Sequence, residues 1–216
     1  MARGSRPPAG FVGGLGVAVV LVVGLIISSV GRDLPVGFDQ GWHDFLASYR
    51  SAAADSVARL LNVAGGTLAM TVVTAVIAVG LAIRRNFRAA ISVALTVAAA
   101  SGLSSLIKIG VSRPRPPDGI VAAASNSFPS GHTTTAAALT IALVIAFPRV
   151  WAGVLAAVWI PLMGLSRNYL LVHWLSDVVA GALLGASVAL VVSAIVRVAT
   201  ARILKEPSPD SAPITG

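Results

Sequence analysis

Two histidines in this chain have neighbours that suit nucleophilic or acid–base chemistry. His173 precedes Asp177 by four residues, so the two side chains share one face if the segment is helical. A carboxylate placed in this way accepts the Nδ1 proton of the imidazole and leaves Nε2 free as a base or nucleophile. His132 is a second candidate, because an imidazole can supply the proton that a leaving group needs. A buried His–Asp pair can also be a simple polar contact, and the residue types do not decide which histidine attacks, although the carboxylate favours His173.

Three basic residues and one predicted helix start suit the binding of a tetrahedral dianion. Lys108, Arg115 and Arg167 each lie beside the end of an apolar run. Ser130 is a natural N-cap for the run that follows it, and Gly131 would let an anion approach the free N–H groups of that helix start. Each feature alone has a structural explanation, as a snorkelling cation or a simple cap. Combined with two histidines, they predict one anion-binding catalytic site.

The remaining polar residues give no second site. Arg113 is interpreted as a cation that anchors a helix end, and His43 as a surface residue without matching partners. The chain has no cysteine and three histidines, and the carboxylates nearest the candidate site are Asp118 and Asp177. Zinc needs three or four His, Cys or acidic ligands, and magnesium needs carboxylates. We therefore expect no metal and no other cofactor.

The composition shows which elements must position these residues. Hydrophobic residues make up 56% of the 216, and charged residues only 11%, against about 25% charged in an ordinary soluble domain. So little polar surface predicts a membrane protein. The net charge of +8 comes from basic residues placed singly at the ends of apolar runs, which argues against a nucleic-acid partner.

The apolar runs predict an all-α, polytopic membrane helix bundle. A hydrocarbon core of about 30 Å needs roughly 20 apolar helical residues. Residues 1–205 should form one membrane domain, and the proline-containing segment 206–216 should be a disordered cytoplasmic tail. Six transmembrane helices are expected, over residues 11–30, 64–83, 89–111, 131–147, 150–165 and 175–198.

A shorter segment between the first two spans is amphipathic. Its apolar residues repeat at helical spacing, which predicts a helix that either lies in the outer membrane interface or packs on the bundle. They are Trp42, Phe45, Leu46 and Tyr49.

The placement of lysine and arginine predicts the orientation. With the N-terminus inside, nine of the 16 basic residues fall on the inner side and seven on the outer side. Three of the outer seven, Lys108, Arg115 and Arg167, belong to the candidate site, which leaves nine against four. Both termini should be cytoplasmic, in the plasma membrane, with the site on the outer face.

Three segments together resemble the type 2 phosphatidic acid phosphatase superfamily, whose site is shared with vanadium haloperoxidases. The family's motifs are Lys-x6-Arg-Pro, Pro-Ser-Gly-His and Ser-Arg-x5-His-x3-Asp. Residues 108–116, 129–132 and 166–177 match them in identity, spacing and order.

The resemblance implies a metal-independent membrane lipid phosphatase. In such an enzyme His173 attacks phosphorus and becomes a phosphohistidine, Asp177 orients it, His132 protonates the leaving group, and water then cleaves the intermediate. The implied phosphate-binding residues are Lys108, Arg115, Ser130, Gly131 and Arg167.

The implied substrate is a lipid phosphate or diphosphate, such as phosphatidic acid or a polyprenyl diphosphate. A lipid phosphotransferase would use the same residues. An anion transporter would explain the cations but not the His–Asp pair with a second histidine.

Overall fold

The computed structural model describes residues 7–30, 37–123 and 125–203, and every regular element in these ranges is a helix. The predicted all-α class is confirmed. The predicted tail, 206–216, lies outside the described residues. The helices are α1 (Ala9–Val30), α2 (Gly37–Ser48), α3 (Ala52–Ala64), α4 (Thr67–Ile83), α5 (Phe87–Val111), α6 (Gly131–Ala146), α7 (Val150–Tyr169) and α8 (Leu175–Ile203).

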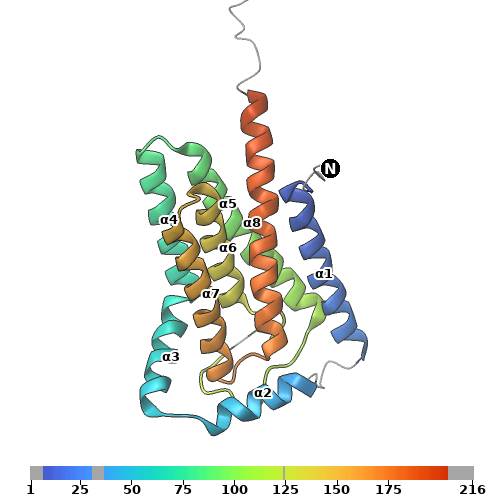
Figure 1. Ribbon diagram of the computed structural model, residues 1–216. Helices are drawn as coiled ribbons and strands as arrows, with labels where there is room; N and C mark the ends of the chain where they lie inside the picture. Colours follow the sequence, from blue (N-terminus) through green and yellow to red (C-terminus); the bar gives the residue numbers. More distant parts are fainter. Residues whose placement is uncertain (1–6, 31–36, 124, 204–216) are drawn as a thin grey trace, which may run out of the picture.

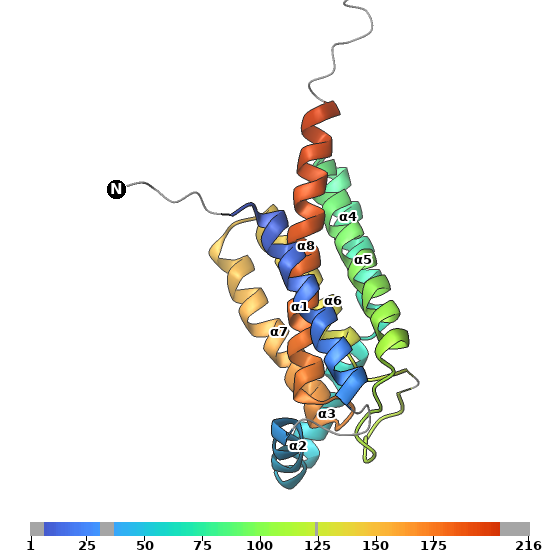
Figure 2. The ribbon, with the colours of Figure 1, turned by 90° about the vertical axis from the view of Figure 1, so that its right-hand side faces the viewer.

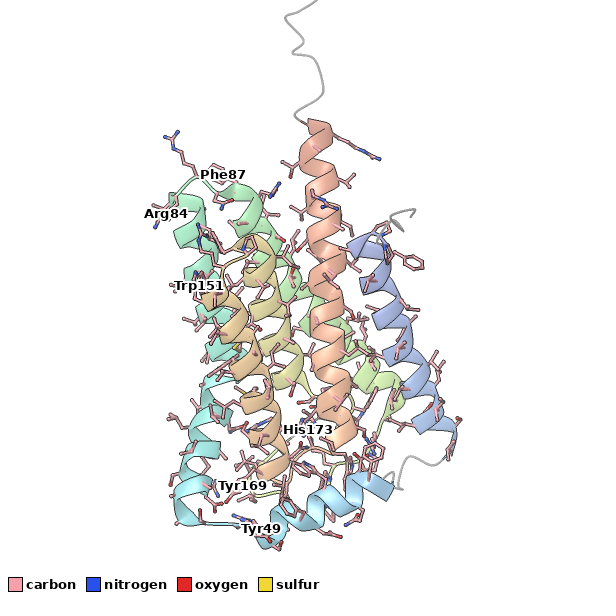
Figure 3. All side chains as sticks on the ribbon, viewed as in Figure 1. Tyr49, Arg84, Phe87, Trp151, Tyr169 and His173 are labelled. Carbon is pink, nitrogen blue, oxygen red and sulfur yellow. The ribbon has the colours of Figure 1, made fainter. Side chains whose placement is uncertain are left out.

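The helices form a bundle with one end closed by a crossing helix. Helices α1 and α4–α8 run along the bundle, and α2 lies across the end opposite to the start of α1 and the end of α8 (Figures 1 and 2). His173 lies at the α2 end, whereas Arg84 and Phe87 mark the other end (Figure 3).

The number of spans differs from the prediction. Four helices, α1, α5, α7 and α8, are long and apolar enough to cross a membrane, and α3 with α4 would form a fifth span that is bent by 56°. Helix α6 is apolar but has only 16 residues. The six predicted spans are therefore not all confirmed, because α6 is short for a 30 Å core.

Helix α3 was not predicted from the sequence. Its N-cap is Ser51, whose side chain accepts a hydrogen bond from the backbone N–H of Ala54. The chain then bends at Gly65 and Gly66, just before α4 begins at Thr67. The predicted span 64–83 thus matches α4, and the bend before it brings part of α3 next to the candidate site.

The outer surface of the bundle is apolar, as lipid contact requires. Side chains that a water-soluble protein would bury are more than two-thirds exposed on several helices. Examples are Leu68 on α4, Ile109 on α5 and Val150 on α7.

Close helix packing fixes the elements that carry the site. A Cβ on Gly185 of α8 would lie 2.2 Å from the carbonyl oxygen of Thr134 and 2.8 Å from Ala137 Cβ, both on α6. Only glycine allows α6 and α8 to approach so closely, which is a common device between membrane helices. Beside this contact, Val93 and Leu184 belong to a continuous buried core.

Helix α2 contacts the bundle through only part of its predicted apolar face. The buried residues of α2 are Asp39, His43 and Leu46, whereas Phe45 and Tyr49 are exposed. Helix α2 thus packs on the bundle, and its position in the outer membrane interface stays a prediction. The buried aspartate shows that polar contacts hold α2 in place.

Candidate active site

One cavity of about 560 Å³ collects most of the predicted site residues. It lies where the segment between α5 and α6 meets the turn between α7 and α8. Ser130 and Asp177 do not line it, because both are fully buried behind the lining. The predicted residues that line the cavity are Lys108, Arg115, Gly131, His132, Arg167 and His173.

His173 and Asp177 meet, but not on one helical face. His173 lies in the turn 170–174, and α8 begins only at Leu175. The His173 Nδ1 and Asp177 Oδ2 atoms are 3.3 Å apart, and the same Oδ2 accepts a hydrogen bond of 2.9 Å from the backbone N–H of Trp174. The carboxylate therefore reaches back over the helix start and holds the turn that carries His173.

The contacts of His173 select one tautomer. An ionised carboxylate can only accept, so Nδ1 must carry the proton that it donates to Asp177. On the other side, Arg115 Nη1 lies 3.0 Å from Nε2, and a guanidinium can only donate. Nε2 therefore carries no proton, and its lone pair accepts from Arg115, a second residue of the cavity lining.

Burial lowers the pKa of His173 from 6.5 to about 3. The hydrogen bond and charge of Asp177 raise this pKa, while the positive charges of Arg115 and Lys108 lower it further. At neutral pH the imidazole is uncharged, so no proton has to leave Nε2 before it can attack an electrophile.

His132 stands in the first turn of α6 and faces the bend between α3 and α4. Its Nε2 lies 3.2 Å from the backbone carbonyl oxygen of Asn62. Since a carbonyl can only accept, Nε2 carries the proton in this contact. This proton is hydrogen-bonded to Asn62, so His132 can serve as a general acid when its ring is doubly protonated as the imidazolium.

Asn62 is a cavity residue that the sequence did not reveal. Its Oδ1 accepts a hydrogen bond of 2.5 Å from Arg167 Nη1, and its carbonyl meets His132. The only available signal was an asparagine three residues before the Gly65–Gly66 pair. One neutral residue at the α3–α4 bend thus holds both a predicted acid and a predicted phosphate ligand.

The cations are held by neutral groups at the cavity wall. Lys108 Nζ donates to the carbonyl oxygens of Asn126 and Ser127, at 2.6 and 3.3 Å. Arg115 donates from Nε to the carbonyl oxygen of Ser125 at 2.7 Å. None of these partners carries a charge, so the positive potential of the cavity is left for an anion.

The Nη2 group of Arg167 is a candidate donor to a bound anion. It is 2% exposed, and its Nη2 is buried without a hydrogen-bond partner within the described part of the chain. Unpaired buried donors are rare in native proteins. A phosphate oxygen in the cavity would satisfy this one.

The start of α6 has the predicted position but a different cap. Ser130 is the N-cap residue, yet its side chain makes no capping bond; its Oγ accepts instead from Thr133 Oγ1 at 3.0 Å. The free N–H groups of the first turn therefore stay available to an anion. A Cβ on Gly131 would lie 3.9 Å from Lys108 Cε, an ordinary contact distance, so Gly131 stands directly beside Lys108.

A family model described as the PAP2 superfamily matches residues 89–201, which is more than half of the chain. The chain belongs to the PAP2 superfamily. The match covers α6, α7 and nearly all of α5 and α8, and it includes every predicted site residue, whereas Asn62 lies outside it.

Curated relatives match this PAP2 chain over a short stretch. The lipid A 1-phosphatases of Rhizobium etli and Rhizobium johnstonii are both 42% identical over 64 residues, 29% of this chain. The chain spans about a quarter of the length of these relatives, 26% and 25%.

Two solved structures share the fold over most of their length. The PAP2-type phosphatidylglycerolphosphate phosphatase of Bacillus subtilis is 22% identical, with a TM-score of 0.61 over 88% of this chain and 98% of that one. LpxE of Aquifex aeolicus is 18% identical, with a TM-score of 0.62 over 75% of this chain and 96% of that one. This PAP2 chain is a multi-pass membrane protein.

The interpretation of Arg113 as a helix-end anchor is wrong. The side chain is 1% exposed, and it forms ion pairs with Asp39 at 2.8 Å and with Asp177 at 2.7 Å. Snorkelling was expected because neighbouring cations in the sequence suggested a helix end. The physical reason for burial is a pair of carboxylates, one of them from α2.

The interpretation of His43 as a surface residue without partners is also wrong. Its Nε2 lies 3.0 Å from Asp118 Oδ2, and its ring lies beside that of Trp174, with the centroids 5.5 Å apart. The partners come from segments 75 and 131 residues further along the chain, so local spacing could not reveal them.

Proposed function

We propose that this protein is an integral membrane lipid phosphatase that removes a terminal phosphate through a phosphohistidine intermediate. The observation that carries the proposal is His173 at the wall of a cavity lined by Lys108, Arg115 and Arg167, with its Nε2 in contact with Arg115 Nη1. A neutral nucleophile, a proton donor and cations around one space are what phosphoryl transfer requires.

The first step breaks the bond between phosphorus and the leaving oxygen. Nε2 of His173 attacks phosphorus, and the Nδ1 proton stays in its hydrogen bond to Asp177, which stabilises the imidazolium that forms. His132, doubly protonated as the imidazolium beside the bound phosphate dianion, gives one proton to the leaving oxygen and becomes neutral. Arg115 Nη1 donates a hydrogen bond to Nε2 before the reaction. When the P–N bond forms, the same N–H group can instead donate its hydrogen bond to a phosphate oxygen.

The second step restores the enzyme. Water attacks the phosphohistidine, one of its protons goes to the now neutral His132 and restores the imidazolium, and the P–N bond breaks to release inorganic phosphate. By this sequence His132 acts first as acid and then as base. Lys108, Arg115, Arg167 and the backbone N–H of Gly131 stabilise the negative charge of the phosphoryl group in both steps, whereas the predicted ligand Ser130 lies behind the cavity wall.

The space beside the site supports a lipid substrate. An apolar cavity of about 350 Å³ between α4 and α5 shares Thr67, Ser101 and Thr135 with the catalytic cavity. Met70 and Val97 belong to its walls. A phosphate in the catalytic cavity would thus have room for an apolar tail beside it, as in phosphatidic acid or a polyprenyl diphosphate.

The expected result for the wild-type protein is release of inorganic phosphate from such lipids in detergent micelles. The measurement is phosphate release from phosphatidic acid, phosphatidylglycerol phosphate and undecaprenyl diphosphate beside a water-soluble monoester. Activity should survive EDTA and be inhibited by vanadate, which imitates the five-coordinate transition state. Turnover of the soluble ester alone would contradict the lipid assignment, and new phospholipid without free phosphate would indicate a phosphotransferase.

We further propose that both termini are cytoplasmic and that the site faces the outside of the plasma membrane. The start of α1 and the end of α8 share the bundle end opposite to α2 and the site (Figure 1). Alkaline phosphatase fused after Asp118 should therefore be active, and fused after Phe87 it should be inactive. The opposite pattern would reverse the orientation.

A further inference from the structure

We propose that Arg113 and Asp39 are positioning residues that hold Asp177, and through it His173, in the attacking geometry. Helix α2 would then be a working part of the active site and not only a cover on the bundle. The inference rests on the proposed function, because it assigns His173 and Asp177 the roles given above.

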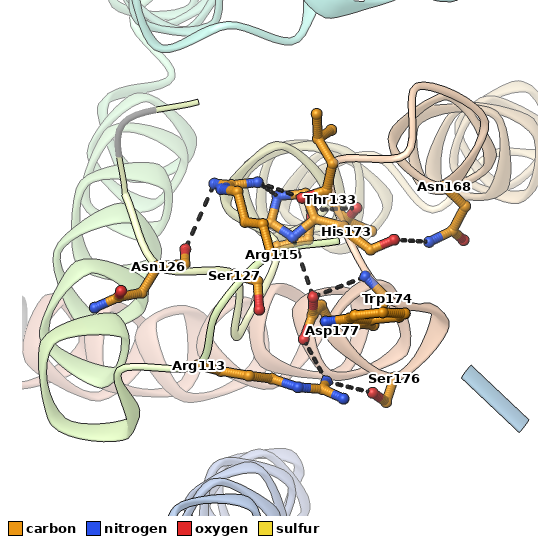
Figure 4. A network of polar contacts seen from close by, with 12 residues as sticks. Arg113, Arg115, Asn126, Ser127, Thr133, Asn168, His173, Trp174, Ser176 and Asp177 are labelled. Atoms are coloured by element: carbon orange, nitrogen blue, oxygen red, sulfur yellow. Dashed lines mark hydrogen bonds and ion pairs between the residues drawn. The ribbon is translucent and has the colours of Figure 1, made fainter. Parts of the chain in front are cut away.

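The carboxylate of Asp177 is held from two sides, one for each oxygen (Figure 4). Oδ2 meets Nδ1 of His173 and accepts from the backbone N–H of Trp174. Oδ1 accepts a hydrogen bond of 2.7 Å from Arg113 Nη1. Two directed contacts on opposite oxygens fix the rotation of a carboxylate, so Arg113 determines where Oδ2 points.

Arg113 is in turn fixed by Asp39. Its Nη2 donates to Asp39 Oδ2 at 2.8 Å, so the guanidinium bridges the two carboxylates with its two terminal nitrogens. A planar guanidinium presents its donors in a rigid fork. Movement of either carboxylate therefore moves the other.

A second connection runs from α2 directly to the start of α8. Asp39 Oδ1 accepts from the backbone N–H of Ser176 at 2.8 Å, and Asp39 Oδ2 accepts from Ser176 Oγ at 2.6 Å. Ser176 Oγ also accepts from Arg113 Nη1 at 2.7 Å. Asp39 thus accepts hydrogen bonds from Ser176, the residue next to Asp177, and from the guanidinium of Arg113.

The charges explain why two residues are needed. Asp39 and Asp177 are fully buried, and Arg113 is 1% exposed. Arg113 alone would share its positive charge with Asp177 only and would weaken the hold of that carboxylate on the imidazole. Asp39 takes part of that charge, so Asp177 keeps the basicity that a developing imidazolium requires.

The test compares Asp39→Asn with Asp44→Asn, an exposed aspartate on the same helix that contacts Gln40. Asp39→Asn is expected to lower kcat by about 10–100-fold, the size seen when a residue that orients a functional histidine is lost, with KM within about 2-fold. Asp44→Asn should leave both unchanged. In the Asp177→Asn background, Asp39→Asn should add little further loss, because the two act through one contact. A merely structural role would give two different results: Asp39→Asn would lower kcat and raise KM by similar factors, and its effect on kcat would be as large in the Asp177→Asn background as in the wild-type protein. Those results would overturn the inference.

An NMR measurement tests the geometry of His173 without measuring turnover. It therefore separates this inference from the proposed function. The Nδ1–H proton of His173 is identified in the NMR spectrum of the wild-type protein by its loss in His173→Gln. Ser176→Ala, which removes one hydroxyl from the network, and Asp39→Asn should shift this signal, whereas Asp44→Asn should not. An unmoved signal in both variants overturns the inference, whether or not the wild-type protein releases phosphate. Absence of phosphate release with a shifted signal would refute only the proposed function.

Discussion

Replacing His173 with alanine is expected to lower kcat by about 10⁴-fold or more, because removal of a nucleophile leaves only binding and electrostatic stabilisation. Affinity for a lipid phosphate should change far less, since Lys108, Arg115 and Arg167 remain in the cavity. The measurement is turnover of a lipid phosphate together with trapping of an acid-labile phosphoenzyme from a labelled substrate.

The matched control is His132→Ala with a substrate that carries a good leaving group. That variant should still form the phosphoenzyme, because its nucleophile is intact. A trapped phosphohistidine in His173→Ala would show that another residue attacks, and it would exchange the roles assigned to the two histidines.

The second large effect concerns the proton donor. His132→Ala should slow hydrolysis of a lipid phosphate by about 10²–10⁴-fold, the usual contribution of a general acid. Nitrophenyl phosphate should be slowed far less, because its leaving oxygen is weakly basic and departs without a proton. The measurement is kcat/KM of the same variant on both substrates.

Asn62→Ala is the companion variant for this experiment, since Asn62 supplies the carbonyl that His132 contacts through its backbone, which the substitution retains. The decrease in kcat/KM caused by Asn62→Ala should therefore be the same for substrates with good and with poor leaving groups. If His132→Ala were to slow both substrates equally, the assignment as general acid would be refuted.

The sequence predicted which motif residues come together in the candidate site because their pattern is local. The groups around His132 and His173 combine rare residue types at short, fixed spacings, and the ends of apolar runs place them at one end of a bundle. The His–Asp contact was predicted for a helical face, and the structure forms it across a turn and a helix start instead. The partners were right although the local geometry was not.

The rest of the site could not be predicted because its partners are distant in the chain. Asp39 lies 74 residues before Arg113, and Asn62 lies 105 residues before Arg167. Each is a single polar residue in a helix, without a pattern that separates it from a solvent-exposed one. Helix α3 was missed for a related reason, since an amphipathic helix before a glycine pair resembles a loop when only long apolar runs are sought.

The hydrogen bond between Asn62 and Arg167 bears on the end of the catalytic cycle. A buried guanidinium that loses its anion must be solvated by something, and a cavity without a substitute would retain its product tightly. The amide of Asn62 is such a substitute, because it is neutral and lies 2.5 Å from Arg167 Nη1. The incoming phosphate can displace this amide from the guanidinium. When the phosphate leaves, the amide can take its place again. A carboxylate in its place would exclude the substrate, and an aliphatic side chain would leave the product as the best partner that Arg167 has.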